Sequence, residues 1–208
     1  MTILALEFSS GQRSVALARA GNILSETVDE TAGRGTAAFA MIENVLARAK
    51  MEREEIRAIA VGLGPGSYTG VRASIALVQG WQLARGIKAI GVSSAAAIAA
   101  RAQTEKISGR LNVIIYAQRE EFYLAQYQIS ETACAEIAPL KIVSLAEVQS
   151  RSRQGQMLVG PEAAKFSGRA IFPRASDVAK LALGQTQFLA GENLEPIYLR
   201  ETTFAKAH

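Results

Sequence analysis

The segment AIAVGLGPGSYTGVRASIALVQGWQLAR, residues 58–85, decides how the rest of the chain is interpreted. It begins with a short apolar run, continues through a loop with four glycines and one proline, and ends in a stretch with helical composition. A strand, a glycine-rich loop and a helix in this order aim backbone amides at a phosphate or at a neighbouring chain. The sequence therefore predicts a strand–loop–helix unit here.

The glycine-rich loop matches neither common phosphate-binding motif. The P-loop needs Lys followed by Ser or Thr, and no lysine lies between Lys50 and Lys88. The dinucleotide pattern GxGxxG fails because its third glycine would fall on Ser67 or Thr69. We expect a tight structural loop, with Ser67 or Thr69 capping the next helix. The residues assigned to this structural loop are Gly64, Pro65, Gly66, Ser67, Thr69, Gly70 and Arg72.

The expected helix at residues 69–85 carries no charged residue between Arg72 and Arg85. Its apolar residues do not fall on one stripe, and a helix that is apolar nearly all round is buried nearly all round. One sheet covers one face, so the other face must meet another helix or another protein. A second helix could approach closely over the small residues Ala73, Ala76, Gly80 and Ala84.

The first half of the chain reads as a three-strand antiparallel meander followed by alternating helices and strands. The expected strands are residues 3–8, 14–20, 23–28, 58–61 and 88–92, and the expected helices are 36–50, 69–85 and 95–102, with caps at Thr36 and at Ser93–Ser94. A meander followed by alternating α and β is the pattern of the ribonuclease H-like half-domain, which recurs in actin and Hsp70.

The second half repeats this order in smaller form after a polar break at residues 104–109. Strands are expected at 112–117, 121–128, 140–143, 157–159 and 170–172, helices at 145–150 and 176–189, and an extended tail at 196–200. The predicted fold class is therefore α/β, with two ribonuclease H-like lobes of the actin/Hsp70-like (ASKHA) ATPase superfamily. The expected division is a first lobe over residues 1–104 and a smaller second lobe over 105–208.

Composition narrows the function classes. The net charge is +4 without a basic cluster, and the one cysteine, Cys134, excludes an intrachain disulfide and an all-cysteine metal site. The one histidine, His208, is the last residue, which excludes an internal Ser-His-Asp or Cys-His arrangement. We find no signal peptide and no apolar stretch of membrane-spanning length. These features favour a cytoplasmic protein, with no membrane contact and no cofactor.

One nucleotide-site hypothesis stays open at the turn after the first strand. In the actin-like plan this turn carries a metal-coordinating acid and phosphate contacts, here Glu7, Ser9 and Ser10. The alternative is an acid at the end of a strand and an ordinary Ser-Gly turn. A second acidic loop is absent, because no aspartate lies between Asp29 and Asp177. An independent nucleotide-binding phosphotransferase or peptidase is therefore the alternative function rather than the main one.

The sequence resembles the TsaB (YeaZ) family in three segments. The strongest match is GPGSYTGVR at residues 64–72, followed by GVSS at 91–94. The opening ILALEFSSGQRSVAL and the tail Pro196-Ile197-Tyr198-Leu199-Arg200 are similar to the family's first and last motifs. Three departures stand out: Glu7 in place of the usual Asp, Tyr116-Ala117-Gln118-Arg119 without the family's acid, and Arg34-Gly35-Thr36 without its histidine.

The resemblance implies a dimerization or scaffold subunit without catalysis of its own. Such a subunit binds a TsaD-like transferase and supports threonylcarbamoyl transfer to N6 of adenosine beside the tRNA anticodon. A TsaE-like ATPase would join through the complex, tRNA would be contacted indirectly, and a homodimer would use the same helical face. The chain cannot be the catalytic partner, whose His-x-x-x-His metal site it lacks.

In the family, two helices of the first lobe pack against the partner's equivalent helices. The two helices expected at 36–50 and 69–85 carry more apolar surface than one fold needs, which supports the same face. We expect these helices to supply core and interface together, without a sequence criterion that separates the two roles. The expected partner residues are Phe39, Met41, Ile42, Val45, Ile75, Val78 and Trp81, with Leu46 and Leu77 beside them.

Overall fold

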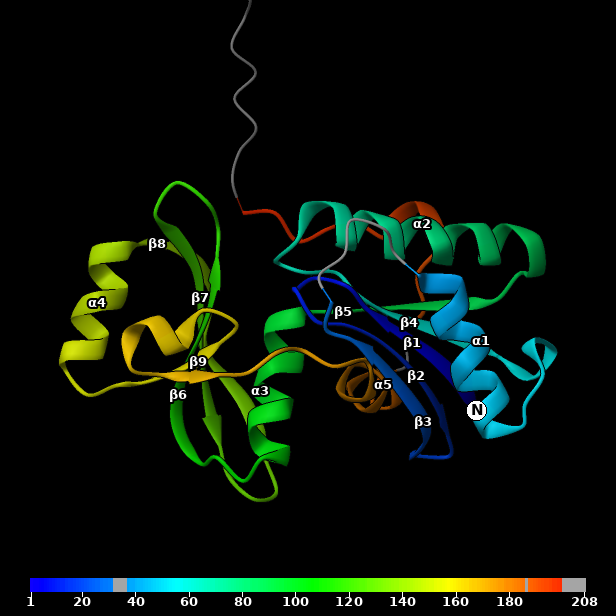
Figure 1. Cartoon of the computed structure of the whole chain (residues 1–208), viewed down its shortest axis with the longest axis horizontal. Coiled ribbons are helices and arrows are strands. Elements are labelled where there is room, and N and C mark those ends of the chain that lie inside the picture. Colours follow the sequence, from blue (N-terminus) through cyan, green and yellow to red (C-terminus); the bar gives the residue numbers. More distant parts are fainter. Residues whose placement is uncertain (32–36, 186, 200–208) are drawn as a thin grey trace, which may run out of the picture.

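The computed structural model describes residues 1–31, 37–185 and 187–199, which contain two five-stranded sheets (Figure 1). In the first sheet the strand order is β3-β2-β1-β4-β5, antiparallel from β1 to β3 and parallel from β1 to β5. Its strands are β1 (Thr2–Glu7), β2 (Arg13–Arg19), β3 (Asn22–Asp29), β4 (Ala58–Gly62) and β5 (Lys88–Val92). Every residue of β1 is buried, because this central strand is covered on both faces.

The second sheet repeats the topology of the first, with the order β10-β9-β6-β7-β8. Its first three strands form an antiparallel meander, and β9 and β10 extend it in parallel from β6. The strands are β6 (Gly109–Tyr116), β7 (Glu121–Ile129), β8 (Cys134–Ser144), β9 (Met157–Gly160) and β10 (Arg169–Ala170). The predicted fold class, two ribonuclease H-like lobes of the actin/Hsp70-like kind, is confirmed.

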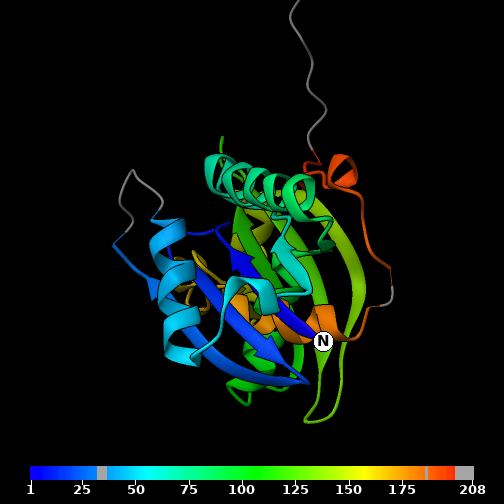
Figure 2. The ribbon, with the colours of Figure 1, turned by 90° about the vertical axis from the view of Figure 1, so that its right-hand side faces the viewer.

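Helices cover both faces of the first sheet. The side chains of α1 and α2 share one core cluster with Leu4 and Leu6, whereas α5 packs on the opposite face against Ile3 and Ala5 (Figure 2). The helices are α1 (Ala38–Ala49), α2 (Tyr68–Arg85), α3 (Ser94–Thr104), α4 (Leu145–Arg153) and α5 (Ala175–Leu183), with 3₁₀ turns η1 (Arg53–Glu55), η2 (Ala163–Phe166) and η3 (Gly191–Asn193). Because successive residues of β1 point to opposite faces of the sheet, they contribute to two separate hydrophobic cores.

The two lobes exchange their last helices. Helix α3 follows the first sheet in sequence but packs on the second, where Ile98 and Ala102 contact Leu111 and Val113. Helix α5 follows the second sheet and packs on the first. The expected division at residue 104 therefore separates the strands of the two lobes but not their helices. As a statement about folding units, that division stays a prediction.

Several element bounds differ from the expected ones. Strand β8 begins at Cys134 rather than at residue 140, because pairing with β7 continues through two register shifts. Helix α5 ends at Leu183 rather than 189, since Gly184 follows it and Leu189 instead forms a bridge with Ala89. Strand β10 ends at Ala170, two residues before the expected end at residue 172. Strand β8 is therefore longer than expected, whereas α5 is shorter.

Some expectations concern residues outside the described part of the chain. They are the Thr36 cap, the Arg34-Gly35-Thr36 segment, Arg200 in the tail motif and the terminal His208. The described α1 begins at Ala38 with no side-chain cap at Ala37. In the ranges that the structure describes, we find no helix with the length and apolar character needed to cross a membrane.

Candidate functional site

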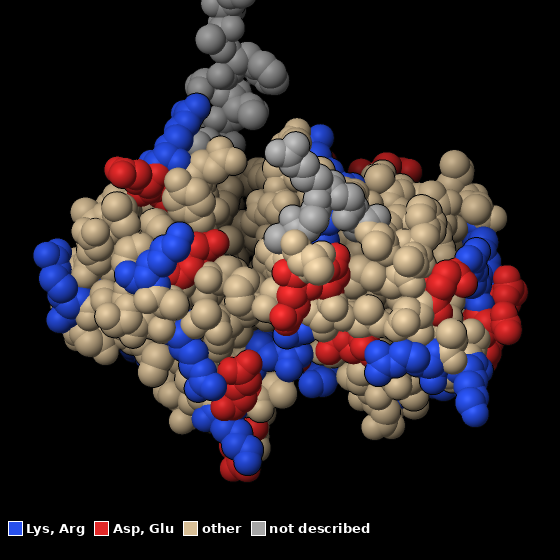
Figure 3. Space-filling view, viewed as in Figure 1, with Lys and Arg blue, Asp and Glu red and all other residues tan. Residues whose placement is uncertain are grey.

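The outward surfaces of α1 and α2 expose large apolar side chains. Figure 3 shows a mostly uncharged surface over these helices, with charged residues of both signs gathered toward the right-hand edge of the molecule. Leu83 on α2 is 91% exposed and Phe39 on α1 is 65% exposed. Ala76 and Gly80 lie on the same face of α2 as Leu83 and are also exposed. Two large apolar side chains and a strip of small residues are thus left uncovered.

The structure separates the core residues from the surface residues among those expected to meet a partner. Met41, Ile42, Val45, Ile75 and Val78, which we expected to supply core and interface together, are all buried within the chain's own core. They point down onto β1, β2 and β4, which is the stripe that a sheet-covering helix must bury. Phe39 is exposed and Trp81 is half-buried at the edge of this core. Leu46 is buried and Leu77 is half-buried.

Sequence reasoning did not single out Leu83 as a surface residue. The signal was available, because residues 72, 76, 80 and 83 fall three or four apart and share a helical face. That face carries Arg72 at its start and then Ala76, Gly80 and Leu83, whereas the face with Ile75 and Val78 carries the β-branched residues that fill the core.

The glycine-rich loop packs tightly against the end of β1. Gly64 and Gly66 have positive φ angles of 85° and 150°. A Cβ on Gly66 would collide with the backbone oxygen of Ser9, and one on Gly70 with that of Phe8. Ser67 caps α2 by accepting from the Gly70 N–H at 3.2 Å, and its own N–H donates to Ser9 O at 2.6 Å. The glycines therefore let α2 start directly against the end of β1.

Glu7 is sealed inside the first lobe. Its carboxylate accepts the Ser9 N–H at 2.7 Å and the Ser94 hydroxyl at 2.8 Å, and its side chain is fully buried. A Cβ on Gly62 would also meet this carboxylate, so the chain closes over it. Burial raises the pKa of Glu7, with the hydrogen bonds from Ser9 and Ser94 opposing the shift. Glu7 therefore ties β1, β4 and the start of α3 together and does not face solvent as a metal ligand would.

A cleft of about 1040 Å³ lies between the two lobes. Ser9, Ser10 and the start of α2 line it from the first lobe, but Glu7 does not. Its second-lobe side is formed by the ends of β6 and β7, and Tyr198 of the tail also lines it. Of the three residues in the nucleotide-site hypothesis, the structure thus brings only the two serines to the cleft.

The tail holds one side of α2. Gln79 Nε2 donates to Gly191 O at 2.8 Å, and Gln82 Nε2 donates to Leu189 O at 3.1 Å. Farther along, the Ile197 N–H donates to Leu63 O at 2.8 Å. The tail thus covers the glutamine side of α2 and leaves the side with Leu83 open.

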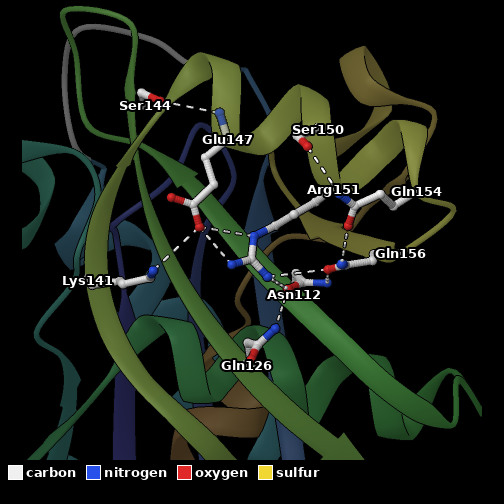
Figure 4. Close-up of polar contacts among 9 residues, drawn as sticks. All are labelled: Asn112, Gln126, Lys141, Ser144, Glu147, Ser150, Arg151, Gln154 and Gln156. Carbon is white, nitrogen blue, oxygen red and sulfur yellow. Dashed lines mark hydrogen bonds and ion pairs between the residues drawn. The ribbon is translucent and has the colours of Figure 1, made fainter.

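A polar cluster on the second lobe has a structural role (Figure 4). Arg151 on α4 donates to Glu147 at 2.7 Å and to Asn112 on β6 at 3.0 Å. The Asn112 amide also accepts from Gln126 on β7. These contacts bind α4 to the sheet, and the neighbouring Arg151 guanidinium lowers the pKa of Glu147. Because Arg151 and Glu147 are paired with each other, neither side chain is available for acid–base chemistry.

The described residues contain no group of three or more His, Cys, Asp or Glu side chains that could hold a metal ion. Burial raises the pKa of the Cys134 thiol, which opposes nucleophilic use. The described side chains thus include exposed apolar residues on α1 and α2 and the lining of a cleft between the lobes.

Comparisons with known proteins agree with this arrangement. A family model described as TsaD, tRNA N6-adenosine threonylcarbamoyltransferase, matches residues 35–197. The tRNA threonylcarbamoyladenosine biosynthesis protein TsaB of Escherichia coli (strain K12) is 30% identical, over 96% of this chain and 95% of its own length. The protein of the same name from Haemophilus influenzae is 30% identical over 99% and 97%. The solved structure "YeaZ from Pseudomonas aeruginosa" has a TM-score of 0.79 at 25% identity, covering 95% of this chain and 99% of that one.

Proposed function

The chain belongs to the family described as TsaD, tRNA N6-adenosine threonylcarbamoyltransferase, and within that family to the TsaB proteins. On that premise we propose that it is a non-catalytic subunit that binds a TsaD-like transferase. Membership gives the chain a role in tRNA threonylcarbamoyladenosine biosynthesis. The proposed contribution is to hold the transferase in the form that transfers the threonylcarbamoyl group to N6 of adenosine in tRNA.

The exposed face of α1 and α2 is the observation that carries this proposal. Leu83 and Phe39 supply apolar anchors, and interface energy is concentrated in a few such side chains. Ala76 and Gly80 between them allow a partner helix to approach closely. A partner face that is apolar and helical, as in a relative with the same fold, is complementary to this surface. The same face supports a homodimer when no partner is present, because a two-fold contact uses one patch twice.

The chemistry of the described side chains supports the proposed lack of catalysis. The acid nearest to the actin-like catalytic position, Glu7, is sealed and hydrogen-bonded within the fold. The nucleophile, base and metal ligands for the transfer would then come from the partner. A TsaE-like ATPase would act through the same complex, tRNA would be held mainly by the transferase, and the complex would work in the cytoplasm.

Co-purification of the full chain with its host's TsaD-like protein tests the proposal. The informative variants are Leu83→Glu, which places a charge on the face, and Gly80→Leu, which adds bulk where a Cβ meets nothing within 4 Å. Ile137→Glu is the matched control, because Ile137 is also exposed, at 45%, but lies on β8 of the second lobe.

We expect a one-to-one complex for wild type and for Ile137→Glu, and at least about tenfold weaker binding for Leu83→Glu and Gly80→Leu. Leu83→Glu and Ile137→Glu should unfold near the wild-type temperature, because neither side chain belongs to the chain's own core. Gly80→Leu should unfold at the same temperature or higher, because leucine is a better helix former than glycine. If all four proteins bind equally, the helical face is not the site. If wild type does not bind, the proposed subunit role fails.

A further inference from the structure

Four of the chain's five tyrosines line the cleft between the lobes. Tyr68 at the start of α2 and Tyr198 in the tail belong to the first-lobe side, and Tyr116 and Tyr123 belong to the second-lobe side. Tyr68, Tyr116 and Tyr198 are exposed, at 56%, 46% and 38%. Nothing in the subunit role described above uses these rings. Aromatic side chains concentrated in one solvent-open cleft are typical of sites that stack planar rings.

The first-lobe side of the cleft combines these rings with positive charge. The rings of Tyr68 and Tyr198 are stacked with their centroids 5.7 Å apart and an interplanar angle of 22°. The guanidinium carbon of Arg72 lies 4.4 Å from the Tyr68 ring centre and 5.9 Å from that of Tyr198. Helix α2 begins at this wall with no acidic residue in its first turn. Ring faces and a neighbouring cation together suit a base with its phosphate.

The charges of the cleft favour a ligand with few phosphates. Arg13 and Arg72 line it together with Glu162 and Glu195, so its side chains carry no large positive excess. Nucleoside triphosphates are usually bound with Mg²⁺, and the described residues include no metal-binding group while Glu7 is closed off. One unit of a single-stranded RNA brings only one negative charge. About 1040 Å³ accommodates one or two such units.

We propose that the cleft between the lobes binds a single-stranded RNA segment, with a base stacked on the Tyr68–Tyr198 pair and its phosphate beside Arg72. The proposal rests on the subunit role, because the proposed partner acts on a tRNA base that must be unpaired to be modified. This chain would then hold RNA next to the modified base directly. Recognition by stacking has little sequence preference.

Fluorescence anisotropy with a labelled eight-nucleotide oligo(A) RNA tests the proposal, using the full chain alone and in complex with its partner. Tyr198→Ala removes one stacked ring, and Tyr198→Phe keeps it. Phe188→Ala is the matched control, because Phe188 is also 38% exposed and near the tail but lies beside Lys88, outside the cleft. Tyr116→Ala tests the opposite side of the cleft without touching the tail.

We expect at least about fivefold weaker RNA binding for Tyr198→Ala and Tyr116→Ala, and wild-type binding for Tyr198→Phe and Phe188→Ala. Arg72→Gln should lower the slope of log affinity against log salt by about 0.7, the value of one single-strand phosphate contact, whereas Arg85→Gln at the far end of α2 should not. Thermal unfolding of each variant checks that the fold is kept.

Three outcomes overturn the RNA site. They are no RNA binding by wild type in either form, wild-type affinity in both Tyr198→Ala and Tyr116→Ala, or displacement of the RNA by ATP at lower concentration than by unlabelled RNA. The last would show a free-nucleotide site. Complex formation is measured separately from RNA binding. If the chain does not bind its partner but still binds RNA in a tyrosine-dependent way, the subunit role alone is rejected. A complex that forms normally but binds RNA independently of the tyrosines would reject the RNA site alone.

Discussion

Arg101 Nε lies 2.7 Å from Asp177 Oδ2, and this ion pair joins the two helices that the lobes exchange. Asp177 on α5 is fully buried, and the side chain of Arg101 on α3 is 21% exposed. This contact pairs a guanidinium with a carboxylate inside the fold. Arg101 Nη2 also donates to Ser176 at 2.9 Å. The relative position of the lobes therefore depends on a charge pair that water barely reaches.

Asp177→Ala should lower the free energy of unfolding by about 3 kcal/mol, because it leaves a mostly buried guanidinium without its partner. Urea unfolding followed by circular dichroism measures the change. Glu55→Ala is the matched control, because the Arg19–Glu55 pair has the same 2.7 Å separation but is 44% and 43% exposed. Breaking that pair should cost about 1 kcal/mol or less. Equal effects at the two sites would show that burial of the Arg101–Asp177 pair is unimportant.

Glu7→Gln should change how stability depends on pH. Burial raises the pKa of Glu7, so the folded protein binds this proton more readily than the unfolded chain does. The resulting stabilisation is present at low pH and is lost as pH rises through the folded-state pKa, above the ordinary value of 4.5. Glutamine keeps the shape of the protonated acid and does not titrate. The unfolding temperature of wild type should therefore fall relative to Glu7→Gln between pH 4.5 and pH 8.

Parallel curves for the two proteins would contradict the assignment, because the other buried carboxyls are common to both and cancel. Glu7→Ala serves as the second variant. It leaves the Ser9 N–H and the Ser94 hydroxyl unpaired inside the fold, so it should cost about 2 kcal/mol at every pH.

The fold was predictable because its signals are local. Continuous apolar residues in β1, alternation in β2 and β3, and the glycines before α2 each set one element, and the element order then gives the topology. The exchange of α3 and α5 was not predictable, because Ala95, Ala99 and Ala102 would fit under either sheet. Small residues carry little information about which surface they meet.

The site was predictable only in outline for a similar reason. The sequence identifies α1 and α2 as too apolar for one sheet, but the direction of each side chain depends on how the helix is rotated on that sheet. Val78 was therefore placed in the expected partner set and Leu83 was not, whereas the core buries Val78 and leaves Leu83 91% exposed. The stacking of Tyr198 on Tyr68 brings together residues far apart in the sequence, which no local pattern encodes.

Val78→Glu and Leu83→Glu should differ sharply in stability although both lie on α2. Val78 is fully buried in the core between α2 and the sheet, so a carboxylate there should cost about 4 kcal/mol or more and leave little folded protein. Leu83 is 91% exposed, so its replacement should change the free energy of unfolding by about 0.5 kcal/mol or less. Soluble yield and thermal unfolding separate the two cases. A large loss at Leu83 would mean that the outward face of α2 is misassigned.

Gly70→Ala and Gly80→Ala should have opposite effects within one helix. At Gly70 the new methyl group would run into the backbone oxygen of Phe8, which cannot move without displacing the end of β1, so stability should fall by about 2 kcal/mol. At Gly80 nothing lies within 4 Å of the new Cβ, so the higher helix propensity of alanine should raise stability by about 0.5–1 kcal/mol. Chemical unfolding of both variants measures the difference. If a partner helix packs on Gly80, Gly80→Ala should weaken the complex while making the chain itself more stable. If the variant gains stability but binds the partner as wild type does, the helix contact lies elsewhere.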